Sequence, residues 1–431
     1  MNQQRYIHLP QDYYDSRLML TEVLFYVVIL LLPFENLFTI MGASIIKLAA
    51  LVFLPFSFVH WGTFYGKVPR AILMLLGYVF IGIAVDIASG AFSDNLMIIA
   101  GPFFMWWMVL VSYNLACCGR LNRFAGIFCM TSIVLMGFQM FSIESKSTRV
   151  IEGVIAGVAG ERISALETDP NGLAIFASLG FIYCLARGLN LLKTKLGYRL
   201  IFLFVAILCF FAILKTGSRG GLLAVLISIV SLIFTRSGTG KIIFSGVIVA
   251  CVIFVMGFAI VRDDFFMARI QSRVENQEGF AGSSVMESVD TAGRFEIWNV
   301  TLGLIANSPI YGYGAQTQIF VLGKAIYGAG RIRVTHNQLL TVLLGSGLSG
   351  FICYLYFYIC AFKSVWICRT KEINIILFLW FVLMFVGGMS LSMDSWKPYW
   401  IVAALALAAK DSDVRLSRKI FEKGAEVGKS Y

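Results

Sequence analysis

Long apolar runs alternate with short polar segments along the whole chain. Most of these runs are close to the roughly 20 residues with which an α-helix crosses the hydrocarbon core of a bilayer, satisfying its backbone hydrogen bonds internally. The pattern therefore predicts an all-α polytopic membrane protein with about twelve transmembrane helices. We place these helices at residues 18–34, 37–60, 70–89, 96–117, 123–143, 169–187, 198–214, 218–235, 242–261, 335–362, 373–391 and 396–410.

The composition excludes a soluble globular protein, because 59% of the 431 residues are hydrophobic and only 14% are charged. A net charge of +11 can indicate nucleic acid binding. In so apolar a chain, cationic loops that hold helices in the bilayer explain it better, and we expect no nucleic acid partner. Residues 1–431 are expected to form one integral membrane domain, associated with membrane lipids.

The nine cysteines lie in apolar runs or at helix ends predicted to be cytoplasmic, so they indicate neither a disulfide nor a zinc site. The first apolar run begins after Arg17 and lacks a small-x-small cleavage site. We therefore expect it to be retained as the first span.

The distribution of lysine and arginine predicts the orientation of the chain. If the N-terminus is cytoplasmic, every cytoplasmic segment contains lysine or arginine, so both termini are expected to lie in the cytoplasm. Two long segments, 143–168 and 262–334, then face the outside. The second is inserted between the ninth and tenth helices and is the expected extramembrane subdomain.

Within the segment 262–334 we expect short helices at 263–277 and 294–308. Four apolar residues of the second helix share one face, which would pack against the bundle or lie in the membrane interface: Phe295, Trp298, Leu302 and Ile305.

The motif KTGSRGG, residues 215–221, places Lys215 and Arg219 in a short outside turn, where the charge bias predicts no cations. In a structural interpretation, Gly217 ends one helix, Ser218 caps the next and Arg219 extends to lipid headgroups. In a functional interpretation, Arg219 at a helix N-terminus forms an anion site, because a guanidinium can hold a phosphate through two hydrogen bonds.

His336 is the one histidine of three that falls on the outer side, at the start of the apolar run 335–362. It either caps that helix beside Asn337 or acts as a general base, since an imidazole titrates near neutrality and can take a proton from an attacking hydroxyl.

Three of the six arginines in the long outside segment are candidate site residues. Arg294 opens its second predicted helix, and Arg331 and Arg333 directly precede His336. Both ends of the segment are embedded, so it must fold back over the bundle. An outward cavity lined by several arginines would attract an anionic substrate.

Acidic and intramembrane charged residues are less specific. Asp169 with Pro170 is typical of a helix start, although Glu167 and Asp169 would also suit a metal ion or a sugar hydroxyl. Lys47 and Asp86 fall within predicted spans and indicate either an ion pair or a substrate contact.

The glycines of the motif GSGLSG, residues 345–350, predict close packing between helices. We see in them no direct role in chemistry.

The motifs TDPNGLA, TGSRGGLLA, GRFEIW with SPIYGYG, and THNQLL with GSGLSG occur in this order. Together they resemble the bacterial O-antigen ligase and O-antigen (exopolysaccharide) polymerase family. The resemblance implies a fold similar to the C-type membrane glycosyltransferases. It also implies a glycosyltransferase of the bacterial inner membrane that works in lipopolysaccharide or exopolysaccharide biosynthesis, with its active site facing the periplasm.

Such an enzyme moves a glycan from undecaprenyl diphosphate to a hydroxyl acceptor by an inverting displacement, without metal or cofactor. Carried over by motif, Arg219 and Arg294 would bind the donor diphosphate, and His336 would act as the base or orient the acceptor. Further candidate substrate contacts are Lys215, Arg331, Arg333, Asn337, Asp169 and Lys47.

Three acceptors are considered: the core sugar of lipid A for a ligase, a second lipid-linked repeat for a polymerase, and a protein, although protein-glycosylating members usually carry additional soluble sequence. Polymerases of this type often carry an Arg-x10-Gly pattern in their outside loops. Arg149 to Gly160 fits it once and 262–334 has no second copy, which favours the ligase. A flippase of lipid-linked oligosaccharide is the alternative of another class, but it would be expected to show two related halves with interrupted helices.

Overall fold

The computed structural model describes residues 19–32, 39–40, 43–90, 97–140, 170–192, 194–235, 294–328, 331–370 and 372–427, with scattered residues between 243 and 257. Over this part of the chain the protein is helical, apart from a short antiparallel hairpin of β1 (Thr39–Ile40) and β2 (Ala43–Ser44). The all-helical prediction is thus confirmed for the described residues.

Each predicted span other than 242–261 overlaps a helix, although α1 and α2 are shorter than the spans predicted there, and most of 242–261 lies outside the described residues. The helices of the first half are α1 (Leu20–Leu30), α2 (Ile45–Val59), α3 (Trp61–Phe64), α4 (Arg70–Ala88), α5 (Met97–Leu115), the π-helix η4 (Ala116–Arg120) and α6 (Leu121–Met140). They are followed by α7 (Pro170–Gly188), α8 (Leu196–Lys215), α9 (Arg219–Val230) and the 3-10 helix η5 (Ser231–Thr235). The C-terminal helices are α13 (Arg294–Asn307), α14 (Gln318–Tyr327), α15 (Gln338–Cys368), α16 (Glu372–Gly388) and α17 (Lys397–Val427).

Five helices among the described residues are long and apolar enough to cross a membrane. They are Arg70–Ala88, Ala100–Gly137, Asn171–Gly188, Leu196–Lys215 and Gln338–Cys368, and the second of these joins α5 to α6 across Gly119, whose backbone is not helical. The chain is therefore a multi-pass membrane protein.

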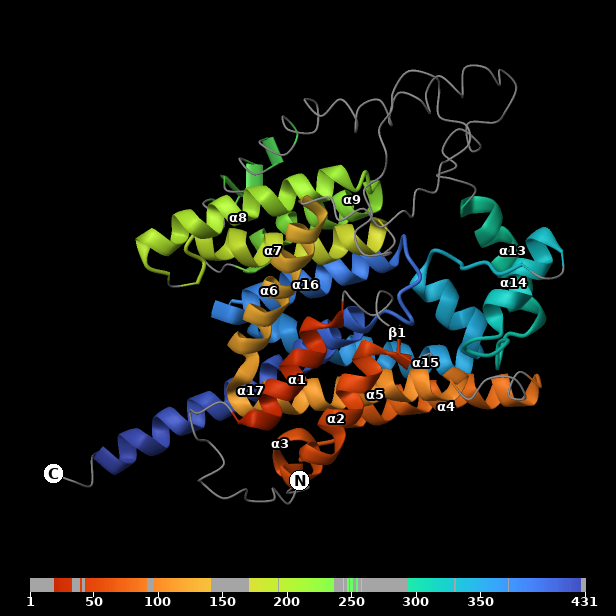
Figure 1. Cartoon of the computed structure of the whole chain (residues 1–431), viewed down its shortest axis with the longest axis horizontal. Helices are drawn as coiled ribbons and strands as arrows, with labels where there is room; N and C mark the ends of the chain where they lie inside the picture. The colour runs from red at the N-terminus through yellow and green to blue at the C-terminus, as the bar shows by residue number, and fades with distance from the viewer. Residues whose placement is uncertain are drawn as a thin grey trace.

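The long helices α4, α5, α7 and α8 run roughly along one direction, and α13 and α14 lie together at one end of the bundle (Figure 1). α15 packs against α4 and α17, α7 against α8, and α16 against α9. Large buried side chains such as Trp380 and Trp400 fill the space between these helices. Loops that are far apart in sequence consequently meet at the ends of the bundle.

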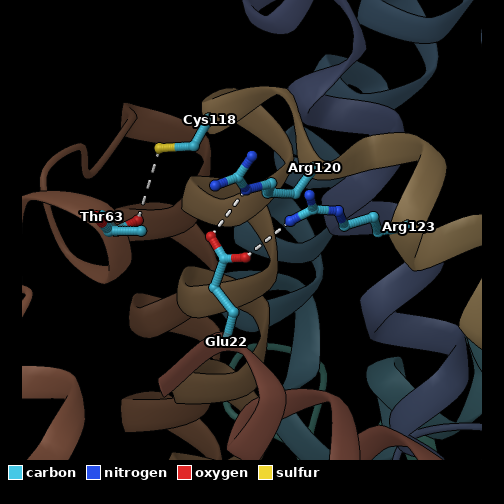
Figure 2. A network of polar contacts seen from close by, with 5 residues as sticks. All are labelled: Glu22, Thr63, Cys118, Arg120 and Arg123. Atoms are coloured by element: carbon cyan, nitrogen blue, oxygen red, sulfur yellow. Dashed lines mark hydrogen bonds and ion pairs between the residues drawn. The ribbon is translucent and has the colours of Figure 1, made fainter. Parts of the chain in front are cut away.

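One end is marked by a buried carboxylate, and we call it the Glu22 end. Glu22 of α1, with a side chain only 1% exposed, accepts hydrogen bonds from Arg120 Nε at 2.8 Å and Arg123 Nη1 at 3.2 Å (Figure 2). Beside this group, the Cys118 thiol lies 4.0 Å from the carbonyl oxygen of Thr63. The ion pairs join α1 to η4 and α6.

At the other end, which we call the His336 end, α15 is broken within the GSGLSG motif. Gly347 has φ 59° and ψ −165°, a conformation open only to glycine in practice. The segment 309–314 fills the break: Leu348 N donates to Pro309 O, and Tyr313 N donates to Leu344 O, both at 2.8 Å. The break leaves a short half-helix that carries the THN motif and a longer half that packs in the bundle.

The glycines of this motif therefore have two functions, of which the sequence predicted one. A Cβ added at Gly350 would clash with Ser346 of the same helix and would lie 3.4 Å from the Tyr78 ring of α4, against which α15 packs as the sequence predicted. A Cβ added at Gly347 would lie 2.4 Å from the carbonyl group of Ile310. At this position glycine admits a loop backbone, and the prediction of helix packing was wrong.

α13 confirms the predicted second loop helix, but its buried face differs from the predicted one. Ile297 and Thr301 are buried, whereas Phe295 is 40% and Leu302 is 53% exposed. The buried face therefore centres on Ile297, and Trp298 and Ile305 of the predicted face are partly buried against it. The helix expected at 263–277 lies outside the described residues.

Candidate functional site

The loop that joins α16 to α17, residues 389–396, connects the motifs at the His336 end. We call it the 389–396 loop. The Ser392 hydroxyl oxygen accepts a hydrogen bond from the backbone N–H of His336 at 3.0 Å. It also lies within hydrogen-bond distance of two other hydroxyls, Thr335 at 3.1 Å and Thr341 at 3.0 Å. One serine of this loop therefore holds the THN segment in place.

His336 is held in an unusual backbone conformation. Its φ is 54°, a region that residues other than glycine rarely adopt, and its side chain is half-buried. The following residue, Asn337, caps α15, since its Oδ1 accepts from the N–H groups of Leu339 and Leu340 at 3.0 and 3.2 Å. The capping role considered for His336 thus belongs to Asn337, whose amide also lies 3.5 Å from the carbonyl oxygen of Met389.

The KTGSRGG turn lies beside the same loop. Gly217, with φ 59°, ends α8, and the Ser218 hydroxyl caps α9 by accepting from Gly221 N at 3.2 Å. These helix-ending and helix-capping roles match the structural interpretation of the turn. A Cβ added at Gly220 would lie 2.6 Å from Ser390 Oγ, so Arg219, at the N-terminus of α9, adjoins the 389–396 loop.

The TDPNG motif joins this turn through a side-chain hydrogen bond. Ser218 Oγ donates to Asn171 Oδ1 of α7 at 2.8 Å. α7 begins at Pro170 as the motif predicts, while Asp169 and Glu167 lie outside the described residues. Lys215 is exposed in the last turn of α8, on the same side of the bundle.

α13 connects to the THN segment directly. Trp298 Nε1 donates to the carbonyl oxygen of Thr335 at 2.9 Å, which ties the GRFEIW motif to the residue before His336. Arg294 opens α13 and is half-buried. The structure therefore brings the segments that carry Arg219, Arg294 and His336 to one end of the bundle.

Arg331 and Arg333 flank one aromatic ring. Their guanidinium carbons lie 5.6 and 5.7 Å from the centre of the Tyr327 ring of α14. Arg331 is exposed, whereas Arg333 is half-buried and lines a cavity. Of the two, Arg333 is the one positioned to meet a ligand.

Two adjoining cavities open at the His336 end. The first has a volume of about 150 Å³ and includes Lys47 in its lining. The second has a volume of about 130 Å³ and is lined by Arg333, Thr335 and Ser392, next to His336. Both cavities share four lining residues, Ala315, Gln316, Asp394 and Ser395, so a ligand that extends over both would pass along this wall.

Asp394 is a candidate residue that the sequence reasoning missed. It lies in the 389–396 loop and lines both cavities, and burial raises the pKa of its carboxyl group, opposed in part by hydrogen bonds from the loop backbone. Its signal in the sequence is a single aspartate between two apolar spans. This pattern is a weak indicator of a functional residue, because the sequence does not show that Asp394 lies near His336.

Asp86 has a structural partner. Its carboxylate is buried at the end of α4 and accepts hydrogen bonds from Thr317 N at 3.0 Å, Thr317 Oγ1 at 2.8 Å and Gln316 N at 3.1 Å. It therefore anchors the start of α14, where backbone N–H groups are in excess. Lys47 lies in the first turn of α2, at the wall of the first cavity.

Among the described residues, no group of three or more histidine, cysteine, aspartate or glutamate side chains is arranged to hold a metal ion.

Comparison with known proteins gives one family. No curated protein matches the chain. Residues 204–355 match a family model described as O-antigen ligase, and this range includes Arg219, Arg294 and His336. The match confirms the resemblance on which the motifs were interpreted. Over residues 204–355, which carry its candidate arginines and histidine, the chain is similar to the O-antigen ligase family.

Proposed function

We propose that the protein transfers a glycan from undecaprenyl diphosphate to a hydroxyl group of lipid A-core, on the periplasmic side of the bacterial inner membrane. The observation that carries this proposal is the convergence at the 389–396 loop. Ser390 adjoins the Arg219 turn, Ser392 holds His336, and Trp298 joins the Arg294 helix to Thr335. The direction of the site rests on the lysine and arginine distribution, which is richer at the opposite side of the spans.

Arg219 and Arg294 are proposed to bind the diphosphate of the donor. As the bond between the anomeric carbon and the phosphate oxygen breaks, negative charge grows on the diphosphate. Guanidinium groups already in position stabilise that charge without reorganising, and they do so most strongly in a site that excludes water. Arg219 also sits at the N-terminus of α9, where the helix dipole favours an anion.

His336 is proposed to act on the acceptor. The acceptor hydroxyl oxygen attacks the anomeric carbon, its proton passes to the imidazole, and the diphosphate leaves with the bonding electron pair. A single displacement of this kind inverts the anomeric configuration. Ser392 holds the backbone that carries the imidazole, and the hydroxyls and amides of the second cavity suit a sugar acceptor.

Reconstitution in liposomes tests the proposal. Purified protein is supplied with an undecaprenyl-diphosphate glycan and lipid A-core, and we expect transfer that persists in the presence of a chelator. His336→Ala should abolish transfer while the protein remains folded. Full activity of that variant would remove His336 from the mechanism, and loss of activity with chelator would redirect attention to Glu167 and Asp169.

The length of the product separates ligation from polymerisation. A single glycan added to lipid A-core supports the ligase. Growth of the lipid-linked glycan in the absence of lipid A-core would replace the ligase with a polymerase, and movement of intact donor across the bilayer without transfer would replace both with a flippase.

A further inference from the structure

The first cavity differs from the second in the groups that line it. It lies among α2, α4, α5 and α17, and two lysines reach it from separate helices. Lys47 lies in the first turn of α2 and Lys397 is the first residue of α17, and both are half-buried. Two helix N-termini therefore add their positive dipole ends to two cationic side chains.

The remaining wall of this cavity is largely apolar. Val79 of α4 and Phe104 and Met105 of α5 line it, and these helices belong to the apolar bundle. A cavity lined by two cations and by several apolar side chains suits an anionic amphiphile, such as the phosphate and first carbons of a lipid. Asp394 also lines this cavity, and burial raises the pKa of its carboxyl.

The position of the cavity relates it to the acceptor. The Arg219 turn meets the 389–396 loop at Ser390, whereas the first cavity meets the same loop at Asp394 and Ser395. The second cavity, with its polar lining, lies between the first cavity and the THN segment, since it shares Asp394 with one and includes Thr335 of the other. A lipid phosphate in the first cavity would thus present its attached sugar toward His336.

We propose that the first cavity binds the phosphate of the acceptor lipid through Lys47 and Lys397. The inference rests on the proposed function, and it adds a recognition site that is separate from the donor arginines. Two acceptors carry this chemistry: lipid A-core that bears phosphate, and a second polyprenyl-diphosphate glycan.

Acceptor kinetics test the site. Lys47→Gln and Lys397→Gln should each raise the KM for phosphorylated lipid A-core by roughly tenfold to a hundredfold, because each removes a charge-assisted hydrogen bond. The KM for the donor and the kcat at saturating acceptor should stay at the wild-type values. Lys324→Gln is the matched control, since Lys324 is exposed on α14 at the same end and lies outside the linings of both cavities.

Phosphatase-treated lipid A-core provides the decisive comparison. The wild-type protein should use it as poorly as the lysine variants use the phosphorylated form, and the variants should lose nothing further. A raised donor KM in the variants would assign the lysines to the donor. An unchanged acceptor KM in both variants would overturn the proposal.

Direct binding separates this inference from the proposed function. Protein in nanodiscs is mixed with phosphorylated lipid A-core, with its phosphatase-treated form, or with undecaprenyl-diphosphate glycan, and retained lipid is measured after washing. Lipid binding that requires both the phosphate and Lys47 supports the site even if no transfer occurs. The lipid whose binding shows this dependence, lipid A-core or the undecaprenyl-diphosphate glycan, is then the one that the cavity binds. If the amount of retained lipid depends neither on the lipid phosphate nor on Lys47, the site is excluded even if transfer is observed.

Discussion

The two ends of the bundle use arginine and lysine differently. At the Glu22 end, two arginines from η4 and α6 converge on one buried carboxylate, with nitrogen to oxygen distances of 2.8 and 3.2 Å (Figure 2). At the His336 end, cations come from separate elements and line cavities or open helices. Lys47, Arg219, Arg294 and Lys397 belong to α2, α9, α13 and α17 respectively.

The acidic residues explain the difference. Glu22 is directed at guanidinium groups, whereas Asp86 accepts hydrogen bonds from the backbone and hydroxyl of the loop before α14, and Asp394 has a raised pKa. Charge at the Glu22 end is compensated within the protein and serves folding. At the His336 end, we propose that the cations attract an anion from outside, which is what a diphosphate donor requires.

The largest expected effect concerns the donor arginines. Arg219→Ala or Arg294→Ala should lower kcat/KM for the donor by roughly a hundredfold to a thousandfold, as loss of a preorganised donor to a developing anion does elsewhere. The measurement is the initial transfer rate over a range of donor concentrations, per folded molecule. Arg199→Ala, at the opposite end of α8, is the control and should be close to wild type. Unchanged donor kinetics in both variants would show that the arginines at the His336 end do not bind the donor.

The next effect concerns stability at the Glu22 end. Glu22→Ala leaves two guanidinium groups without their buried partner and should lower the free energy of unfolding by about 3 kcal/mol, near the lower end of the range for buried pairs. The lower value is expected because the side chain of Arg123 remains 35% exposed. Thermal unfolding in detergent measures the change, with the exposed Glu296→Ala as control. The transfer rate per folded molecule of Glu22→Ala should equal that of the wild-type protein. A lower kcat without a loss of stability would contradict the idea that charges at the Glu22 end serve folding alone.

A smaller effect is expected at Ser392. Ser392→Ala removes the acceptor for His336 N and a hydrogen bond shared with Thr341, so kcat should fall by about tenfold, with about 1 kcal/mol of stability lost. The KM values for donor and acceptor should hold, because Ser392 positions the imidazole through the backbone. Ser392→Thr should restore kcat, and equal loss in both variants would argue against this positioning role. Ser412→Ala on α17 is the control.

The smallest effect is a pH dependence of stability from Asp394. The folded protein holds the Asp394 proton more tightly than the unfolded chain does, because burial raises the pKa of this carboxyl. Protonated Asp394 therefore contributes to the free energy of unfolding in full below the ordinary aspartate pKa of about 3.9. This contribution is lost as the pH rises toward the pKa of Asp394 in the folded protein, by at most about 1.4 kcal/mol per pH unit.

Asp394→Asn should flatten this slope relative to the wild-type protein. Unfolding followed from acidic to neutral pH in both proteins measures the difference. A wild-type slope that is unchanged in Asp394→Asn would show that the carboxyl is not perturbed.

Much of the helical framework could be predicted from the sequence, because a spanning helix is specified by the length of its own apolar run. The N-cap at Ser218 and the helix start at Pro170 were predictable for the same local reason. The break at Gly347 was not, since the residues that fill it come from 309–314, and a glycine alone does not indicate which backbone approaches it.

The site was predicted only as far as its motifs extend. Arg219, Arg294 and His336 could be named as candidates because each stands in a family motif, but the meeting of their segments at one end of the bundle could not. Ser392 and Asp394 lie more than fifty residues beyond His336, in a segment whose pattern reads as an ordinary connection between two spans. Their contacts depend on how α16 and α17 pack, which is a tertiary property.

On the proposed function, the break in α15 would also set the depth at which the reaction takes place. Beyond Gly347 the helix continues for about 20 residues, which corresponds to roughly 30 Å and suffices to cross the hydrocarbon layer unaided. The half-helix that begins at Gln338 would then not be needed for the crossing and would extend toward the headgroup layer, with His336 at its outer tip. A polar sugar can then reach the imidazole without shedding its hydration in the hydrocarbon, while the chains of both lipids stay within the bilayer.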